Sequence, residues 1–280
     1  MKLIVDGGST KTKWIFIKGD NSTKCFITKG INPYFQSTEQ IVHLIKESGV
    51  FIESPAIEYI YYYGAGCANE EKSDQLKEIF ISFAKNATVS IESDLLAAAR
   101  SLFKDKDGVA AILGTGANSG YYDGKNIIDH TPALGYILGD EGSGASIGKR
   151  LATEVFKKQL SNEICEKFKK RFDLNESSLL ENVYKKEFPN RFLASLSVFI
   201  TENKNESSLT DLLRREFDLF FVRNILPYPK ERRSKIGFIG SIAFYYQDIL
   251  KESAKKFDIE IIDICREPSS GLIEFHKYPL

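Results

Sequence analysis

Two glycine-rich stretches carry the residue types that bind phosphate. The first is Asp6-Gly7-Gly8-Ser9-Thr10-Lys11-Thr12, which lies between two apolar runs. Glycines let backbone N–H groups approach a ligand, and successive N–H groups in a turn form an anion-binding concavity. Asp6 ends a run typical of a buried strand, where a carboxylate is costly unless it is paired or faces a cation. An ordinary hairpin with a solvated Asp6 explains this stretch equally well when it is considered alone.

The second stretch is Gly114-Thr115-Gly116-Ala117-Asn118-Ser119. It is not a dinucleotide fingerprint, because its third glycine comes one residue late and the pattern that follows predicts a β-hairpin instead of a helix. No GxxxxGK[ST] motif occurs, so the chain has no P-loop. We interpret the stretch as a second phosphate-binding hairpin, and a plain tight turn is the alternative.

An acidic residue lies at a strand-to-helix junction in Glu92-Ser93-Asp94. Either Ser93 or Asp94 can cap the helix that follows, because both residue types accept a hydrogen bond from the first turn. A carboxylate at such a junction can also accept a proton from a substrate hydroxyl as a general base. Both interpretations of Asp94 remain open at this stage.

Two further stretches complete the set. Gly139-Asp140-Glu141-Gly142-Ser143 places two carboxylates among small residues, a pattern suited to accepting hydrogen bonds from sugar hydroxyls. The alternative is acidic side chains that stabilise the first turn of a helix. Gly240-Ser241 follows a buried strand, where glycine permits close approach of a flat ligand or simply close strand–helix packing.

The elements that must position these stretches occur twice. Apolar runs flanking Asp6–Thr12 predict two strands, and residues 24–29 a third; helices at 39–48, 69–86 and 95–103 alternate with strands at 57–63 and 89–91. A similar three-strand opening begins at Gly108, with strands at 108–113, 120–122 and 126–129. We therefore predict an α/β fold duplicated as two lobes, 1–107 and 108–280, facing each other across a cleft. A charge-rich helical insertion is predicted at about 160–226, followed by a strand at 235–239, a helix at 241–257 and a strand at 259–264.

The composition excludes several classes of protein. The 280 residues include 38 Lys+Arg and 38 Asp+Glu, so the zero net charge argues against nucleic-acid and membrane-surface binding. No apolar run is long enough to span a bilayer, and no signal peptide is expected. Four scattered cysteines without a CxxC pair indicate free thiols in a reducing compartment, so we expect a cytoplasmic protein.

Taken together, these stretches resemble the actin-like ATPase superfamily of sugar kinases, heat-shock ATPases and actin, whose lobes have a duplicated ribonuclease H-like fold. Within it the chain is similar to the BadF/BadG/BcrA/BcrD ATPase family, on its N-acetylglucosamine kinase side. The most specific match is Gly135-Tyr136-Ile137-Leu138-Gly139-Asp140-Glu141-Gly142-Ser143. The resemblance implies an ATP- and Mg²⁺-dependent kinase whose substrate is a small amino sugar, N-acetylglucosamine or a relative such as N-acetylmuramic acid.

The resemblance also implies roles for single residues. Asp94 matches the catalytic base, and Asp6 matches the residue that holds Mg²⁺. The ATP site would comprise Gly7, Gly8, Ser9, Thr10, Lys11, Thr12, Gly114, Thr115, Gly116, Gly240 and Ser241. The sugar pocket would comprise Asn32, Gly135, Asp140 and Glu141.

Two departures from the family pattern affect these expectations. Leu134 replaces a tryptophan of better-known members, which leaves the fit of the acetamido group open. Few residues follow Gly271, so the C-terminal helix that returns to the first lobe must be short or absent. Two other functions stay open: an ATPase activator of a CoA-ester dehydratase or reductase, for which Cys67 would be a cluster ligand, and a non-enzymatic ATP-binding regulator. Homodimerisation is likewise left open.

Overall fold

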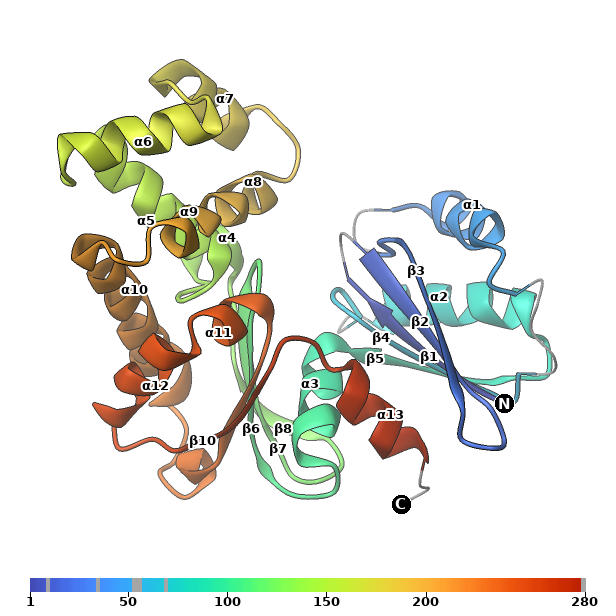
Figure 1. Ribbon diagram of the computed structural model, residues 1–280. Coiled ribbons are helices and arrows are strands. Elements are labelled where there is room, and N and C mark those ends of the chain that lie inside the picture. Colours follow the sequence, from blue (N-terminus) through green and yellow to red (C-terminus); the bar gives the residue numbers. More distant parts are fainter. Residues whose placement is uncertain (9–10, 34–35, 52–56, 68–69, 278–280) are drawn as a thin grey trace. The chain divides into compact units, whose positions relative to one another are not determined.

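The computed structural model describes residues 1–8, 11–33, 36–51, 57–67 and 70–277. The chain divides into two compact units (Figure 1): unit 1 comprises Met1–Asp105 and Pro268–Leu280, and unit 2 comprises Lys106–Glu267. The predicted boundary after residue 107 lies close to this division. The predicted lobe 108–280 needs a correction at its end, because residues from Pro268 onward pack with unit 1 instead of unit 2.

The sheet of unit 1 has five strands in the order β3-β2-β1-β4-β5. Strand β1 pairs antiparallel with β2 and parallel with β4, which in turn pairs parallel with β5. Their β-branched and aromatic residues suit a pleated, buried surface. The bounds are β1 Lys2–Gly7, β2 Lys11–Ile17, β3 Thr23–Lys29, β4 Tyr59–Gly64 and β5 Thr88–Ser93.

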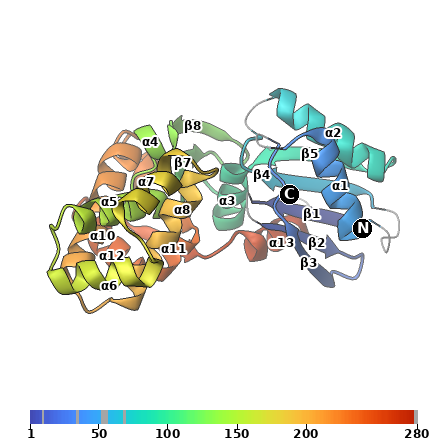
Figure 2. The same ribbon diagram turned by 90° about the horizontal axis from the view of Figure 1, so that it is seen from above.

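Helices cover both faces of this sheet (Figure 2). On one face, helices α1 (Thr38–Ser48) and α2 (Glu70–Phe83) bury their apolar sides against Trp14 and its neighbours. On the other face lie α3 (Asp94–Phe103) and α13 (Ser269–Lys277), where Ala97 and Leu272 pack on the sheet. Helix α13 is the short returning helix, nine residues long. A side chain at Gly271 would collide with Ser101 O at 2.3 Å, so glycine there lets α13 and α3 pack closely.

The sheet of unit 2 repeats this topology. Its order from one edge to the other is β8-β7-β6-β9-β10, which corresponds strand for strand to β3-β2-β1-β4-β5 of unit 1. Strands β6, β7 and β8 are antiparallel neighbours, as β1, β2 and β3 are in unit 1. Strands β9 and β10 run parallel to β6, as β4 and β5 run parallel to β1. The predicted duplication is therefore confirmed at the level of strand order. The bounds are β6 Gly108–Leu113, β7 Ala117–Tyr122, β8 Ile127–Thr131, β9 Ile236–Ile239 and β10 Ile261–Cys265.

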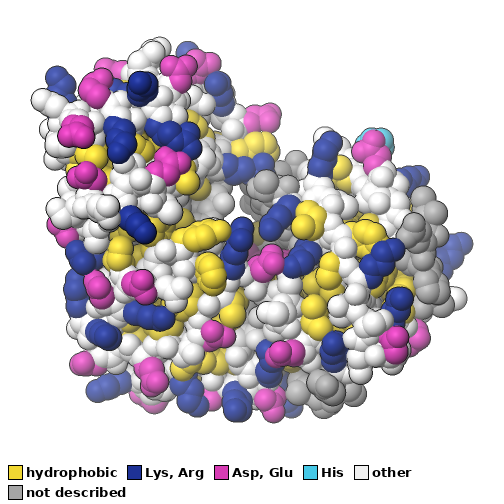
Figure 3. Space-filling model, viewed as in Figure 1, with side chains coloured by type: hydrophobic (Ala, Val, Ile, Leu, Met, Phe, Trp, Pro, Cys, Tyr) yellow, Lys and Arg dark blue, Asp and Glu magenta, His cyan; other side chains and the backbone are white. Residues whose placement is uncertain are grey.

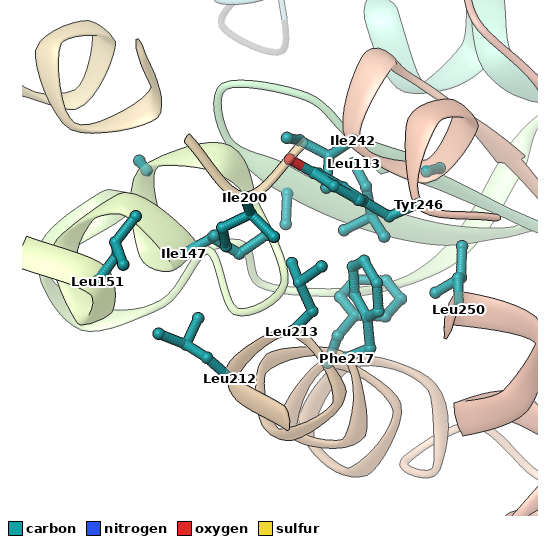
Figure 4. Close-up of a cluster of buried hydrophobic side chains, with 14 of the residues drawn as sticks. Leu113, Ile147, Leu151, Ile200, Leu212, Leu213, Phe217, Ile242, Tyr246 and Leu250 are labelled. Atoms are coloured by element: carbon teal, nitrogen blue, oxygen red, sulfur yellow. The ribbon is translucent and has the colours of Figure 1, made fainter. Parts of the chain in front are cut away.

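Helices fill the region between β8 and β9, where the sequence predicts a helical insertion. Their apolar faces form the larger core of the molecule (Figure 4), in which Leu213 and Phe217 of α10 pack with Ile147 and Leu151 of α5. The bounds are α4 Gly135–Leu138, α5 Gly144–Phe156, α6 Asn162–Phe172, α7 Glu176–Tyr184, α8 Pro189–Leu196, α9 Val198–Glu202 and α10 Ser207–Phe220, followed by a π-helical turn η1, Phe221–Ile225, and a short 3₁₀ turn η2, Arg232–Ser234.

The predicted helix 241–257 is interrupted at Tyr246. Helix α11 (Ser241–Tyr245) ends there and α12 (Gln247–Lys255) begins after it. The buried Tyr246 hydroxyl donates to Ser197 O at 2.8 Å and lies 2.8 Å from Thr201 Oγ1. Both partners of Tyr246 belong to the helical insertion. The interruption therefore comes from tertiary packing, which the local sequence does not reveal.

Charged side chains of both signs are interspersed on the face shown in Figure 3, in keeping with the equal numbers of acidic and basic residues. Among the described residues, no helix combines the length and the apolar character needed to cross a membrane.

Candidate active site

Asp6 and Asp94 lie at the same edge of the sheet of unit 1. In the register of the parallel strands, Asp6 is opposite Tyr63, and Gly64 is opposite Ser93. The carboxyl ends of β1, β4 and β5 therefore meet, and ligands of open α/β sheets bind at this kind of edge. The predicted metal residue and the predicted base, far apart in sequence, are thus brought together by one sheet.

Ser93, and not Asp94, caps helix α3. The Ser93 hydroxyl accepts the Leu96 N–H at 3.2 Å, and Asp94 is the first helical residue. Burial raises the pKa of Asp94, although the backbone N–H of Leu95 partly opposes this. Because Ser93 provides the cap, the half-buried Asp94 carboxylate is not needed to cap the helix. A carboxylate with a raised pKa is also a better proton acceptor.

The first glycine turn is shaped by Tyr62. A Cβ at Gly7 would lie 2.2 Å from the Tyr62 hydroxyl oxygen, so the tyrosine ring itself requires glycine there. The Gly8 N–H donates to Lys11 O at 3.0 Å and closes the turn. The Lys11 side chain is exposed. The predicted phosphate ligands Ser9 and Thr10 lie outside the described residues.

Thr12 and Asn32 occupy buried positions beside this turn. The Thr12 hydroxyl, fully buried, accepts the Ile31 N–H at 2.8 Å. Asn32 is 6% exposed, and its backbone N–H donates to Gln36 Oε1 at 2.7 Å. The hydroxyl that the sequence assigned to phosphate is therefore engaged with the segment that carries Asn32.

In unit 2, the second glycine turn packs on the first turn of α5. Gly114 O accepts the Gly144 N–H at 2.8 Å, and Thr115 O accepts the Ala145 N–H at 3.1 Å. Ser143 caps the same helix by accepting the Ser146 N–H at 3.2 Å. The exposed Thr115 side chain has no hydrogen-bond partner in the part of the chain that the structure describes. A Cβ at Gly114 would meet nothing within 4 Å, so this turn has open space beside it.

Asp140 joins this turn from the loop between α4 and α5. Its Oδ1 accepts the Ala117 N–H at 3.1 Å, whereas its Oδ2 accepts no hydrogen bond from the residues described. The carboxylate lies 3.1 Å from the position that a Cβ at Gly116 would take. Burial raises the pKa of Asp140 and the charge of Glu141 adds to this, while the Ala117 N–H and Lys149 oppose it.

Glu141 points into the protein instead. Its Oε1 accepts from Arg223 Nη1 at 2.7 Å and its Oε2 from Asn224 Nδ2 at 3.2 Å. Burial opposes ionisation, but these hydrogen bonds lower the pKa of Glu141. Both oxygens brace the loop against the π-helical turn η1, which differs from the sugar-binding role predicted for Glu141. Sequence reasoning missed Arg223 and Asn224, because no local motif marks them.

The loop around Gly135 has an unusual backbone. Leu134, Gly135, Asp140 and Gly142 all have positive φ angles, between 58° and 72°. A Cβ at Gly139 would lie 2.1 Å from Ala133 O. Leu134 and Gly135 are exposed. This backbone ends α4 at Leu138 and places Asp140 in a loop before α5 begins at Gly144.

Gly240 and Ser241 lie next to the second glycine turn. Gly240 has a φ of 128°, and a Cβ there would lie 2.2 Å from Leu113 O and 3.1 Å from Gly114 N. The Ser241 side chain is exposed. Unit 2 thus brings three predicted ligand segments to one edge of its sheet, at residues 114–116, 140 and 240–241.

The duplicated sheets and the glycine turns at their carboxyl edges define the class: this is an actin-like ATPase fold with two ribonuclease H-like units. A solved structure of a putative N-acetylglucosamine kinase from Porphyromonas gingivalis is 39% identical, with a TM-score of 0.93, over 99% of this chain and 98% of that chain. The chain belongs to the same family as that protein.

More distant structures share the fold. A putative N-acetylglucosamine kinase from Chromobacterium violaceum is 16% identical over 98% of both chains, with a TM-score of 0.72. A ROK family glucokinase from Streptomyces griseus, solved with glucose and AMPPNP, is 13% identical over 99% of this chain and 98% of that chain, with a TM-score of 0.56. A scan of protein-family models and a search of curated proteins both gave no match.

Proposed function

We propose that this protein transfers the terminal phosphoryl group of ATP to a hydroxyl of an amino sugar, N-acetylglucosamine or a related N-acetylhexosamine. The observation that carries the proposal is Asp94, a carboxylate at the carboxyl edge of the sheet that burial makes more basic and that does not cap its helix. Phosphoryl transfer needs such a base to accept the proton of the attacking hydroxyl. Family membership with a putative N-acetylglucosamine kinase supports the same conclusion. Membership in the BadF/BadG/BcrA/BcrD family stays a prediction.

The residues present fit ATP and Mg²⁺. The open space at Gly114 and the exposed hydroxyls of Thr115 and Ser241 suit phosphate and nucleoside contacts. The described residues hold no cluster of three metal-ligating side chains. Mg²⁺ usually needs only one or two carboxylates because substrate phosphates supply other ligands, so Asp6 would suffice. When bound, the ion neutralises charge that develops on the phosphate oxygens.

Asp140 and Asn32 are the residues we assign to the sugar. Asp140 Oδ2 is the better acceptor for a sugar hydroxyl, because its Oδ1 already binds the Ala117 N–H. Glu141 holds the Asp140 loop in place through Arg223 and Asn224. The exposed Leu134 lies at the start of this loop, so it is the residue we assign to tuning acetamido recognition.

The state of Cys67 favours the kinase over an iron–sulfur activator. The thiol is 8% exposed, and burial together with the charge of Asp94 raises the pKa of Cys67 to about 12. A thiol buried in this way is protonated, as is usual for a structural cysteine.

A coupled ADP-release assay with Mg²⁺ tests the proposal across free hexoses, N-acetylhexosamines and N-acetylmuramic acid. We expect N-acetylglucosamine or a close relative to stimulate ADP release most strongly. Stimulation by glucose alone would contradict the amino-sugar assignment. ADP release that no sugar stimulates would contradict the kinase.

Asp94→Asn tests the base directly. We expect kcat to fall at least about 100-fold, because general-base catalysis typically contributes 10²–10⁴-fold, while binding of ATP measured by calorimetry is retained. Asp248→Asn is the matched control, since Asp248 also lies in the first turn of a helix but is exposed. Near-normal turnover of Asp94→Asn would remove Asp94 from the mechanism.

A further inference from the structure

The Tyr62 ring lies over two paired glycines in unit 1. Gly7 of β1 and Gly64 of β4 are register partners. A Cβ at Gly7 would lie 2.2 Å from the Tyr62 hydroxyl oxygen, and a Cβ at Gly64 would lie 2.7 Å from its Cε1. Both glycines therefore leave the space that the fully buried ring fills, and the ring contacts the strand that carries Asp6.

The hydroxyl of this ring reaches the segment before Asn32. Tyr62 Oη donates to Ile31 O at 3.0 Å in a buried hydrogen bond. Burial raises the pKa of Tyr62, so the phenol remains protonated and can donate. Tyr62 therefore connects Gly7, which follows the predicted metal residue Asp6, with the predicted sugar segment.

Thr12 binds the backbone N–H of Ile31, the residue whose carbonyl accepts from Tyr62. Its buried hydroxyl accepts the Ile31 N–H at 2.8 Å, so side chains satisfy both backbone polar groups of Ile31. Gln36 adds two contacts, accepting the Asn32 N–H at 2.7 Å and donating to Gly30 O at 3.1 Å. The backbone of this segment is thus fixed by side chains from β2, β4 and the chain that follows, and not by a strand or helix of its own.

We infer that Thr12 and Tyr62 form a clamp on Ile31 that sets the position of Asn32, and that both are positioning residues for the sugar. The inference rests on the proposed kinase function and deepens it, because it assigns Thr12 to the sugar side of the site and not to the phosphates. The clamp also links the sugar segment to the Asp6–Gly7 turn through the Tyr62 ring.

Steady-state kinetics of Tyr62→Phe and Thr12→Val test the clamp, since each substitution removes only a hydroxyl or replaces it with a methyl group. We expect the KM for the amino sugar to rise about tenfold in each variant, which corresponds to about 1.4 kcal/mol, with the KM for ATP unchanged. Thr12→Ser keeps the hydroxyl and should restore the wild-type KM for the sugar. A rise in the KM for ATP in Thr12→Val, without a change for the sugar, would make Thr12 a phosphate ligand and overturn the clamp.

Tyr122→Phe is the matched control. Tyr122 is also fully buried, and its hydroxyl donates to a backbone carbonyl, Gly124 O, at 2.9 Å, but it belongs to the β7–β8 hairpin of unit 2. We expect its KM values to match those of the wild type. An equal rise in the KM for the sugar in Tyr122→Phe would show that loss of any buried tyrosine hydroxyl has this effect, and would contradict the specific role of Tyr62.

Hydrogen–deuterium exchange followed on a peptide covering residues 29–33 separates this inference from the proposed function. Exchange at Ile31 should be at least about tenfold faster in Thr12→Val and in Tyr62→Phe, and unchanged in Tyr122→Phe. If wild-type protein phosphorylates no sugar but exchange responds in this way, the kinase proposal fails and the clamp on Ile31 stands. Unchanged exchange in both clamp variants would refute the clamp whatever the activity.

Discussion

The role of Asp94 depends on the residue before it. Because Ser93 satisfies the first turn of α3, the Asp94 carboxylate is not needed there, and its burial disfavours the charged form. A capping aspartate accepts backbone N–H groups, which lower its pKa, so it would be a weaker base.

This leads to a prediction for pH dependence. Burial raises the folded-state pKa of Asp94 above its ordinary value of 3.8, and the base must be deprotonated to act. The acidic limb of kcat/KM should therefore have its midpoint above 3.8, with activity lost as the pH falls through it. Fluorescence of the single tryptophan, the buried Trp14, checks folding at each pH. A midpoint at or below 3.8 with folded protein would contradict the prediction.

The sequence marked the candidate stretches but could not always separate neighbouring residues within them. Ser93 and Asp94 are both good caps, and only the structure assigns the cap to Ser93. Asp140 and Glu141 are chemically similar, yet one binds the Ala117 N–H and the other binds Arg223. The backbone at Asp140, with a φ of 60°, and a partner on η1 decide this difference, and neither follows from local sequence.

At the scale of elements, the packing of α5 on α8 depends on Gly148. A Cβ at that position would lie 1.8 Å from Leu193 O, so the two helices are in backbone contact there. The first turn of helix α5 also donates backbone hydrogen bonds to the second glycine turn. Helix packing in the insertion therefore supports the ligand edge of unit 2.

We expect Gly148→Ala to lower the free energy of unfolding by about 1–3 kcal/mol, the usual cost of overpacking a core. Urea or thermal unfolding measures this. Gly19→Ala serves as control, because a Cβ there would meet nothing within 4 Å, and it should change stability by no more than about 0.5 kcal/mol. Equal stability of the two variants would show that α5 and α8 can separate without cost.

Strands and most helices were predictable because periodic burial marks them in the sequence. The positions where helices are interrupted were not predictable from the sequence. Tyr246 interrupts the helix predicted over 241–257 because its hydroxyl binds Ser197 and Thr201. The loop that holds Asp140 has a left-handed backbone at that residue. Both features depend on contacts or dihedral angles that residue types alone do not specify.

For the whole molecule, the duplication was foreseen from the repeated glycine hairpins, but the return of the chain to unit 1 was expected only as a short helix or none. His276 on α13 secures that return. Its Nε2 lies 2.8 Å from the Tyr63 hydroxyl oxygen, its ring stacks on Tyr61 with centroids 3.9 Å apart, and its carbonyl accepts from Lys2 Nζ at 2.6 Å. Burial, with the positive charges of Arg100 and Lys2 adding to it, lowers the pKa of His276 to about 3.

Acid should therefore weaken the folded state. The folded-state pKa of about 3 lies below the ordinary value of 6.5, so the unfolded chain binds the proton more readily between these values and stability is lost as the pH falls below 6.5. At pH 5 the loss from His276 is about 2 kcal/mol relative to pH 8. Denaturant unfolding of His276→Gln at both pH values should show a pH dependence smaller by about that amount.

His43→Gln is the control, because His43 is on α1 with its side chain 70% exposed. It should keep the wild-type pH dependence. Carboxylates contribute equally in all three proteins, so the comparison isolates the histidine. An identical pH dependence in His276→Gln and wild type would contradict a neutral buried His276.

The return of α13 also bears on how the protein is made. Unit 2 is continuous, whereas unit 1 needs residues on both sides of it. On the ribosome, the first strands and helices of unit 1 must wait for the whole of unit 2 to be synthesised, roughly 10–30 s at typical elongation rates. Until α13 emerges, the sheet face on which Ala97 of α3 packs lacks its Leu272 partner. We expect unit 2 to fold without residues from unit 1, whereas unit 1 cannot complete its packing until α13 is available.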